Sequence, residues 1–277
     1  MKRKTISILG CGWLGLPLAK VLQEEGYHLK GSVTTSSKLS ELRQAGISPY
    51  RLALHPGSVE MDDPSFFETD LVIVSIPPRR VPDIEEVFPA QIRQLIGLLE
   101  AHGIGTVLFI SSTSVYAETE GTATETDELL PDKPSGRALV TAEHMLLANP
   151  AFKTTVLRFG GLIGADRNPA RFLTRKREAL SGSKPVNLIH RDDCIGIIRE
   201  IIRQEAWGEV FNACCPEHPT RKEFYEEAAA VSGLPAPEFT DEPEPYKMVN
   251  STKLVRQLNY SFLYHSPMDY LKQLAGM

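Results

Sequence analysis

The chain has 277 residues, of which 42% are hydrophobic and 23% are charged, a composition typical of a globular protein with a full core. Its formal net charge of -5 argues against a nucleic-acid partner, because proteins that bind nucleic acids usually present a clustered basic surface. No apolar run approaches the roughly 18 residues of a membrane span, and the run before Gly10 is shorter than the ~7 to 15 residues of a signal-peptide core. We therefore expect no membrane partner and a cytoplasmic location.

The cysteine pattern supports the same location. The four cysteines show neither Cys-x-x-Cys spacing nor nearby histidine pairs, so the sequence predicts no metal site and no disulfide framework. Reduced thiols are typical of the cytoplasm. These residues are Cys11, Cys194, Cys214 and Cys215.

The N-terminal segment has the pattern of a dinucleotide-binding unit. A strand predicted at Thr5 to Leu9 enters a glycine-rich turn, which leads into a helix at Leu14 to Glu25 and a second strand at Tyr27 to Val33. The turn has Gly-x-Gly-x-x-Gly spacing and lies between strand and helix, which is the context that this motif requires. The sequence therefore predicts a cofactor cradle here rather than a simple turn.

Each residue of this turn has a predicted part in binding. Gly10 permits the tight turn, Gly12 lets the backbone approach a pyrophosphate, and Gly15 allows the helix to pack closely on the strand. The backbone of Trp13 and Leu14 lies at the helix N-terminus, whose partial positive charge attracts phosphate.

The end of the second strand decides between NAD and NADP. At this point an acidic residue binds the 2'-hydroxyl of NAD, whereas a basic one accommodates the 2'-phosphate of NADP. Nothing acidic occurs from Gly26 to Ser40, and the hydroxyl groups and one cation of Thr34 to Lys38 suit a phosphate. The sequence favours NADP over NAD, with a polar turn capping the helix from Lys38 as the alternative. The candidate residues are Thr34, Thr35, Ser36 and Lys38.

A third strand is predicted at Leu71 to Ile76. Ser75 and Pro77 fall at its carboxyl end, where they are predicted to contact the cofactor. Arg79 and Arg80 follow, and they either clamp phosphates or belong to a solvated loop. The sequence leaves these two alternatives open.

Strands and helices alternate over the first 160 residues. Further strands are predicted at Thr106 to Ser111 and Thr154 to Phe159, with helices at Lys38 to Ala45, Ala90 to His102 and Gly136 to Leu147. Such alternation is typical of an α/β fold with a doubly wound parallel sheet, which binds ligands at the carboxyl ends of its strands.

The pattern changes after Phe159 and predicts a second, smaller lobe. A basic helix is expected at Ala170 to Leu180, and strands at Val186 to His190 and Val210 to Ala213 are expected to return to the sheet. We therefore predict a Rossmann domain at 1–164, with 186–213 returning to it, and a discontinuous substrate-binding lobe at 165–185 and 214–277.

Capping residues predict where helices start in the second half of the chain. Thr220 and Glu223 form a predicted capping box for a helix that runs to Val231. Two short closing helices are expected after Ser251 and after Ser266.

Three further motifs resemble one known superfamily. Ser111-Ser-Thr-Ser-Val-Tyr116 follows a strand, and Leu157 to Gly161 and Asn187 to Asp193 lie further along the chain. Together with the glycine loop they resemble the extended or atypical short-chain dehydrogenase/reductases, the group that contains nucleotide-sugar epimerases and dehydratases. The resemblance covers nearly the whole chain and weakens over the last forty residues. It implies NAD(P) binding and a small polar substrate, such as a nucleotide sugar or another anion.

The resemblance also assigns candidate catalytic residues. The family's catalytic serine or threonine falls on Ser112, and Ser111 beside it is predicted to contact the cofactor. The family's Tyr-x-x-x-Lys pair is missing, because Ser135 and Leu139 occupy its two positions. The chain therefore lacks both the usual proton donor and the cation that lowers its pKa.

Three residues are candidates for the missing acid. Tyr116 is the first choice, four residues beyond Ser112, although its ring could instead pack beneath the loop with its hydroxyl group bonded to backbone. Glu125 and Glu128 lie in the next polar loop, where related enzymes place substrate contacts.

Arginines of the second lobe are candidates for substrate binding. Arg167, Arg171 and Arg175 have helical i, i+4 spacing, which suits an anionic substrate or, alternatively, a solvated helix face. His190 and Asp193 have structural roles in this interpretation, with Asp193 capping a helix from Ile195.

Two functions follow from these patterns. The first is an NADP-dependent oxidoreductase or epimerase with a non-standard active site, and the second is a catalytically silent sensor of the NADP redox state. A β-hydroxyacid dehydrogenase type fits less well, because its C-terminal domain is all-helical. Relatives dimerise through the helices here placed at Ala90 to His102 and Gly136 to Leu147, which makes a homodimer possible.

Overall fold

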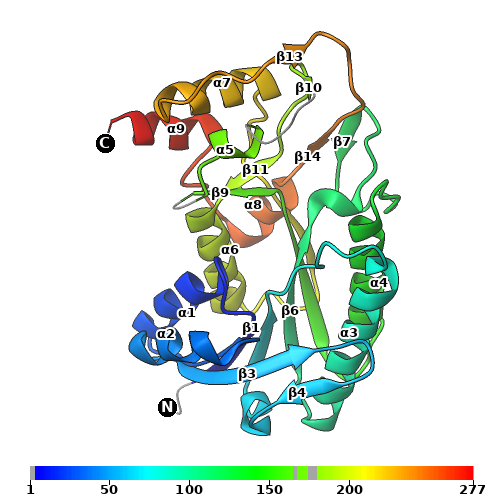
Figure 1. The fold of residues 1–277 in the computed structure, drawn as a ribbon. Coiled ribbons are helices and arrows are strands. Elements are labelled where there is room, and N and C mark those ends of the chain that lie inside the picture. Colours follow the sequence, from blue (N-terminus) through cyan, green and yellow to red (C-terminus); the bar gives the residue numbers. More distant parts are fainter. Residues whose placement is uncertain (1–3, 165–166, 174–179, 277) are drawn as a thin grey trace. The chain divides into compact units, whose positions relative to one another are not determined.

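The structure, a computed structural model, describes residues 4–164, 167–173 and 180–276 (Figure 1). It confirms the predicted α/β class, with a large, mostly parallel central sheet. Two compact units divide the chain: the first holds Met1–Val115, Pro131–Leu157 and Ile201–Val210, and the second holds Tyr116–Leu130, Arg158–Glu200 and Phe211–Met277. No helix in the described ranges has the length and apolar character needed to span a membrane.

The central sheet has eight strands in the order β12-β8-β6-β5-β1-β2-β3-β4. The pairs from β6 to β3 are parallel, and β4 is antiparallel to β3. Strand order reverses at β1, because the chain runs outward to β2 and β3 and then resumes on the other side with β5. In doubly wound sheets this reversal opens a crevice for ligands. The strands are β1 (Thr5–Leu9), β2 (His28–Val33), β3 (Ser48–Leu54), β4 (Val59–Met61), β5 (Leu71–Val74), β6 (Thr106–Ser112), β8 (Lys153–Phe159) and β12 (Val210–Ala213).

Helices of the first unit cover both faces of the sheet. Figure 1 shows α1 (Gly15–Glu24) and α2 (Leu39–Gln44) on one face, and α3 (Ile84–Ala101) and α4 (Pro134–Leu147) on the other. This cover explains why Val72, Ile73 and their neighbours in β5 are fully buried apolar residues rather than alternating ones.

The start of α3 differs from the prediction. The helix was expected from Ala90, but it begins at Ile84, six residues earlier, and contains Pro89. Proline breaks a helix interior because it lacks an N–H group and crowds the carbonyl four residues before. In α3, Pro89 removes only one backbone hydrogen bond, the one that its N–H group would donate to the carbonyl of Glu85. The acidic Glu85 and Glu86 stabilise the first turn of the helix.

Two strands at one end of the sheet, β3 and the edge strand β4, were not predicted. The segment that forms β3 contains Pro49 and Arg51 and is mostly half-buried. It shows neither a continuous apolar run nor alternating apolar and polar residues, the two patterns that predict a strand. Pairing with β2 on one side and β4 on the other holds this segment in the sheet.

The second unit contains three small parallel pairs. Strand β7 (Gly121–Ala123) pairs with β14 (Lys247–Val249), β9 (Gly161–Ile163) with β11 (Leu188–His190), and β10 (Leu180–Ser181) with β13 (Phe239–Thr240). The expected return of Val186 to His190 to the central sheet is wrong, because β11 pairs with β9 instead. Residues 210–213 do join the sheet, as β12.

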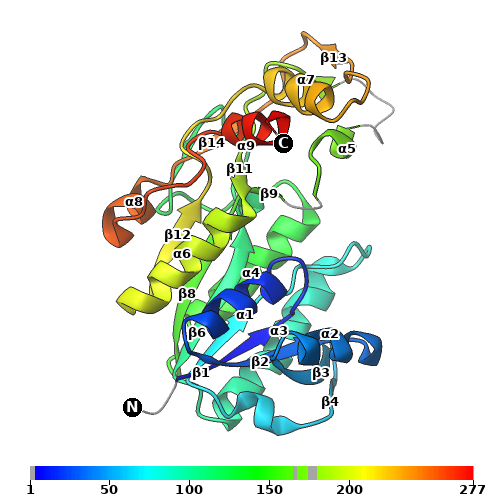
Figure 2. The same ribbon diagram turned by 90° about the vertical axis from the view of Figure 1, so that its left-hand side faces the viewer.

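Helices of the second unit pack around a separate core. Figure 2 shows α7 (Arg221–Val231) and α9 (Pro267–Ala275) side by side, and both begin with a capping box. Phe224 and Tyr270 are buried in this core. The structure confirms the predicted capping box of Thr220 and Glu223. The remaining helices are α5 (Ala170–Leu173), α6 (Arg191–Gln204) and α8 (Thr252–Leu258).

Candidate functional site

A cavity of about 260 Å³ lies in the first unit at the carboxyl ends of β1 and β5. This is the point where the strand order reverses, so the cavity occupies the expected ligand position of a doubly wound sheet. Six residues predicted to bind a cofactor line it: Gly10, Gly12, Thr34, Lys38, Ser75 and Pro77.

Two glycines fix the shape of the loop. Gly10 has φ of +100°, and a Cβ atom there would lie 2.6 Å from the carbonyl oxygen of Ser75. A Cβ atom on Gly15 would lie 2.3 Å from the carbonyl oxygen of Gly10. Both distances are far below van der Waals contact, so the tight turn and the close approach of α1 require glycine.

Gly12 differs from these two residues, because nothing lies within 4 Å of the position that its Cβ atom would occupy. The fold therefore has no internal need for glycine here, and the open space faces the cavity that Gly12 lines. No side chain among the described residues caps α1, and its first turn contains no acidic residue. The start of α1 thus suits a bound anion. Trp13, Leu14 and Gly15 lie beside the cavity in sequence without lining it.

The end of β2 supplies polar groups to the same cavity. Thr34 and Lys38 are exposed and line it, whereas Thr35 and Ser36 are exposed outside the lining. None of the described residues that line the cavity is acidic. Arg79, for which the sequence left two alternatives open, lines it as well.

Sequence reasoning missed several lining residues. The Oγ of Ser32 accepts a hydrogen bond from the backbone N–H of Gly10 at 3.1 Å, and the carbonyl of Ser32 accepts one from Cys11 at 2.8 Å. Gln91 reaches the cavity from α3 while donating to the carbonyl oxygen of Leu54 at 2.7 Å. Ser32 is one of several polar residues in β2, beside His28 and Lys30, so its position gave no distinct signal for these contacts.

Ser111 and Ser112 end β6 in different environments. Ser111 is buried, and its hydroxyl group donates a hydrogen bond to the carboxylate of Glu143 at 2.5 Å. Ser112 is half-buried, and its Oγ accepts a hydrogen bond from the N–H of Ser114 at 3.1 Å. That contact uses a lone pair, so it does not require the hydrogen of the Ser112 hydroxyl group.

The start of α4 shows the consequence of the missing Tyr-x-x-x-Lys pair. Ser135 is half-buried, and Leu139 is only 4% exposed. An apolar side chain thus occupies a position where the family has a cation.

Tyr116, the first choice for a replacement acid, lies in the second unit and is 2% exposed. Its hydroxyl group donates to Asn212 Oδ1 at 2.7 Å and accepts from Arg158 at 2.6 Å. Burial raises the pKa of Tyr116 more than the nearby Arg158 lowers it. This environment favours the packing role over proton transfer, with side chains rather than backbone as the partners of the hydroxyl group.

The other candidate substrate contacts also belong to the second unit. Glu125 is half-buried and accepts a hydrogen bond from the backbone N–H of Asn212 at 2.8 Å, while Glu128 is exposed. Arg167 and Arg171 are exposed, the second on α5. Arg175 lies outside the described residues.

One curated relative matches nearly the whole chain. Protein YeeZ of Escherichia coli K12 is 34% identical over 269 residues, which cover 96% of this chain and 98% of YeeZ. The chain belongs to the YeeZ family. No protein-family model matches it.

Solved structures confirm the fold of this YeeZ-family chain. A conserved protein of unknown function from Silicibacter pomeroyi has a TM-score of 0.78 and 22% identity, covering 99% of this chain and 98% of its own. The UDP-glucuronic acid 4-epimerase of Bacillus cereus in complex with NAD has a TM-score of 0.76 and 20% identity, covering 98% and 99%. The fold that the resemblance to atypical short-chain dehydrogenase/reductases implied is therefore confirmed.

All four cysteines of this YeeZ-family chain are free and buried. Burial raises the pKa of Cys11, which lines the cavity, to about 12, and that of Cys215 also to about 12. The thiolate is the reactive form of cysteine, so these thiols are inert at neutral pH. The cavity therefore offers no nucleophilic sulfur.

We expect the stability of the protein to fall with acidification. Burial lowers the pKa of His190 and of His218 below the usual value near 6.5, although Asp192 opposes the effect on His190. The unfolded chain then takes up protons before the folded chain does, so the full stability is present above about pH 6.5 and is lost as the pH falls toward the folded pKa values. Urea unfolding at a series of pH values from about 7.5 to about 5 measures this loss, and His218→Gln should flatten the dependence. A midpoint urea concentration that rises on acidification would contradict the lowered pKa values of these two histidines.

Proposed function

We propose that the chain is an NADP-preferring oxidoreductase of the epimerase or dehydratase type that acts on a small polar, anionic substrate. The observation that carries the proposal is the cavity at the strand-order reversal, which the glycine loop and the end of β2 line together. The bound NAD named for the B. cereus epimerase supports a dinucleotide as the ligand.

The residues of the cavity fit such a ligand. The open space at Gly12 and the start of α1 would hold the pyrophosphate. Lys38, Thr34 and Arg79 would receive the 2'-phosphate through a point charge, a hydroxyl group and a planar guanidinium. An acidic residue that would select the 2'-hydroxyl of NAD is absent from the described lining.

A nicotinamide cofactor supplies hydride transfer when bound. Within the chain, Ser112 would orient a substrate oxygen through its hydroxyl hydrogen, because its Oγ already accepts the N–H of Ser114. Without the Tyr-x-x-x-Lys pair, proton transfer would fall to Glu125 or Tyr116, and we favour Glu125 because it is half-buried rather than enclosed. Arg167 and Arg171 would then attract the substrate anion.

Calorimetric titration with NADPH, NADP, NADH and NAD tests the cofactor assignment. We expect NADPH and NADP to bind more tightly than NADH and NAD. Lys38→Asp should weaken the binding of NADPH and NADP by about tenfold, since a charged hydrogen bond is worth roughly 1.5 to 3 kcal/mol. The non-phosphorylated forms should be unaffected. Lys20→Asp is the matched control, because Lys20 is an exposed cation of α1 outside the lining. Equal affinity for all four, or no loss with Lys38→Asp, would refute the NADP preference.

A catalytically silent redox sensor is the second candidate. The buried Leu139 and the serine at position 135 favour it, because both standard catalytic groups are missing. A sensor must bind NADPH and NADP with different affinities, since only a difference in affinity shifts a conformational equilibrium. The same titration separates the candidates: equal affinities for the two redox forms eliminate the sensor.

A further inference from the structure

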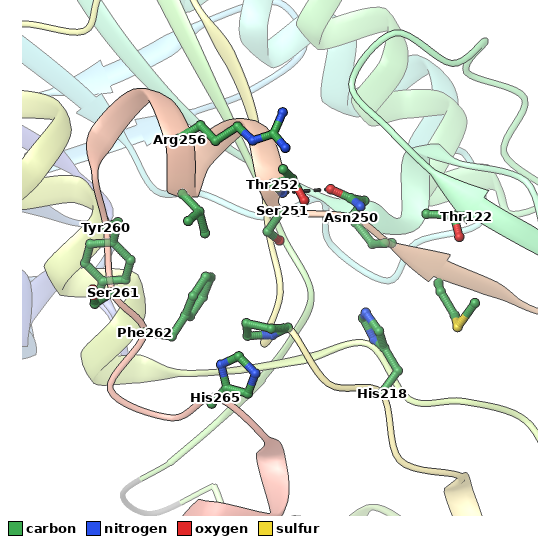
Figure 3. A pocket seen from close by; sticks show the side chains of 14 residues that line it. Thr122, His218, Asn250, Ser251, Thr252, Arg256, Tyr260, Ser261, Phe262 and His265 are labelled. Carbon is green, nitrogen blue, oxygen red and sulfur yellow. Dashed lines mark hydrogen bonds between the residues drawn. The ribbon is translucent and has the colours of Figure 1, made fainter.

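A second and larger pocket, of about 600 Å³, lies wholly within the second unit and has no part in the proposed dinucleotide site. It lies between the β14–α8 segment and the loop 260–265 (Figure 3). Its volume falls within the ~300 to 1,000 Å³ of small-molecule sites. Such sites combine apolar walls with a few placed polar groups, and this pocket has both.

One side of the pocket is apolar and rich in rings. Phe262, Tyr260 and Pro216 line it, and Figure 3 shows the rings of Phe262 and His265 on the same side of the open space. Ring faces of this kind bind flat apolar groups by stacking and area burial. The backbone of the loop is anchored from beneath by Asp193, which accepts hydrogen bonds from Tyr260 at 2.9 Å and from the N–H of Leu263 at 2.7 Å. The wall is therefore held in place before any ligand arrives.

The opposite side carries the polar groups. Arg256 projects from α8 across the space from Phe262 and His265 (Figure 3). Asn250 uses its Oδ1 to accept the N–H of Thr252 at 2.7 Å, which leaves its NH₂ group on the other side as a donor. His218 is occupied, because its Nδ1 contacts the carbonyl of Val186 at 3.1 Å. Asn250 and Arg256 thus offer donors to a ligand on this side of the pocket.

The charge of the pocket lining favours a ligand of negative charge. None of the described residues that line the pocket is acidic, although the chain as a whole has a formal net charge of -5. Arg256 is the cation of this lining, accompanied by His218 and His265. An anionic group near Arg256 therefore meets a guanidinium and no competing carboxylate.

We propose that this pocket binds a small organic anion, with a ring-containing apolar body against Phe262 and His265 and a carboxylate or phosphate group at Arg256. The arrangement follows from the two sides of the pocket, since one offers ring faces and the other offers donors. The site lies outside the glycine-loop cavity, so its occupant is a second ligand and not the dinucleotide.

Calorimetric titration of the full chain with three naphthalene probes tests this assignment. The probes are 1-naphthoate, 1-naphthyl phosphate and the neutral 1-naphthylmethanol, which share one ring system and differ in the group that meets Arg256. We expect at least one anion to bind about tenfold more tightly than the neutral probe, the value of one charged hydrogen bond. The tighter of the two anions identifies carboxylate or phosphate as the preferred group.

Two variants locate the binding. Arg256→Ala should remove the advantage of the anions and leave the neutral probe unchanged, and Val255→Trp should block all three probes because the exposed Val255 lines the pocket. Lys222→Ala is the matched control, an exposed cation on α7 outside the lining. All three substituted residues are exposed, so the variants should fold. Equal binding of anions and neutral probe, unchanged binding in Arg256→Ala, displacement by saturating NADPH, or no binding at all would each overturn the proposal.

Discussion

Replacing Gly15 with alanine is expected to lower the free energy of unfolding by about 2 kcal/mol or more, within the range for forcing atoms into a filled space. The added Cβ atom would lie 2.3 Å from the carbonyl oxygen of Gly10 and 3.3 Å from a methyl group of Ile8. The first neighbour is backbone and cannot rotate away, so α1 must move off the strand. Urea denaturation followed by circular dichroism measures the loss.

Gly12→Ala is the matched control within the same loop. Its Cβ atom would meet nothing within 4 Å, so we expect unchanged stability or a gain of up to about 1 kcal/mol from the less flexible unfolded chain. Its affinity for NADPH should fall, because the new methyl group occupies the space proposed for the pyrophosphate. Equal stability losses in the two variants would contradict the separation of structural and binding glycines. Unchanged NADPH affinity in Gly12→Ala would contradict the proposed position of the cofactor.

Asp193→Ala is expected to lower the free energy of unfolding by about 3 to 5 kcal/mol, the usual result of breaking a buried charged network. The carboxylate is fully buried and accepts hydrogen bonds from the hydroxyl group of Tyr260 and from the N–H groups of Leu263 and Tyr264, the last at 3.1 Å. Alanine leaves these donors without an acceptor. Equilibrium unfolding in urea measures the loss directly.

Two graded variants test the same network. Asp193→Asn retains one carbonyl oxygen but places an NH₂ group against a donor, so its stability should lie between those of the wild type and Asp193→Ala. Tyr260→Phe removes one donor, which contacts Oδ1 of Asp193 at 2.9 Å and its backbone carbonyl at 3.4 Å, and should cost about 1 kcal/mol. A loss below about 1 kcal/mol in Asp193→Ala would show that the loop 260–264 is held by other contacts.

Local patterns of the sequence were sufficient to predict most strands of the central sheet and the starts of helices in the second unit. β1 has the predicted bounds, and Ser266 caps α9 as expected. Both signals are local, since a strand of apolar residues or a capping side chain acts on its own neighbours. Helix ends are local features too, since Gly26, Gly46 and Gly103 follow three helices with positive φ values.

Contacts between segments that are distant in the chain could not be predicted from local sequence patterns. Asp193 was expected to cap a helix from Ile195, and this is wrong, because α6 begins at Arg191 and the carboxylate binds the loop 260–264 instead. A buried acceptor has many possible partners along the chain, and its local pattern does not choose among them. The sequence did not predict the pocket near Arg256 for the same reason, since Thr122 and the segments 216–218 and 248–265 build it jointly.

The interleaving of the two units also constrains how the protein can be made. The chain passes from one unit to the other after residues 115, 130, 157, 200 and 210. During synthesis, the first unit lacks its segment Ile201–Val210 until three quarters of the chain has left the ribosome. Contacts of such long sequence separation slow folding, because the ends of long loops must find each other first. Neither unit is one continuous piece of the gene, so a truncated chain that ends near residue 164 would lack part of both and should depend on chaperones rather than fold alone.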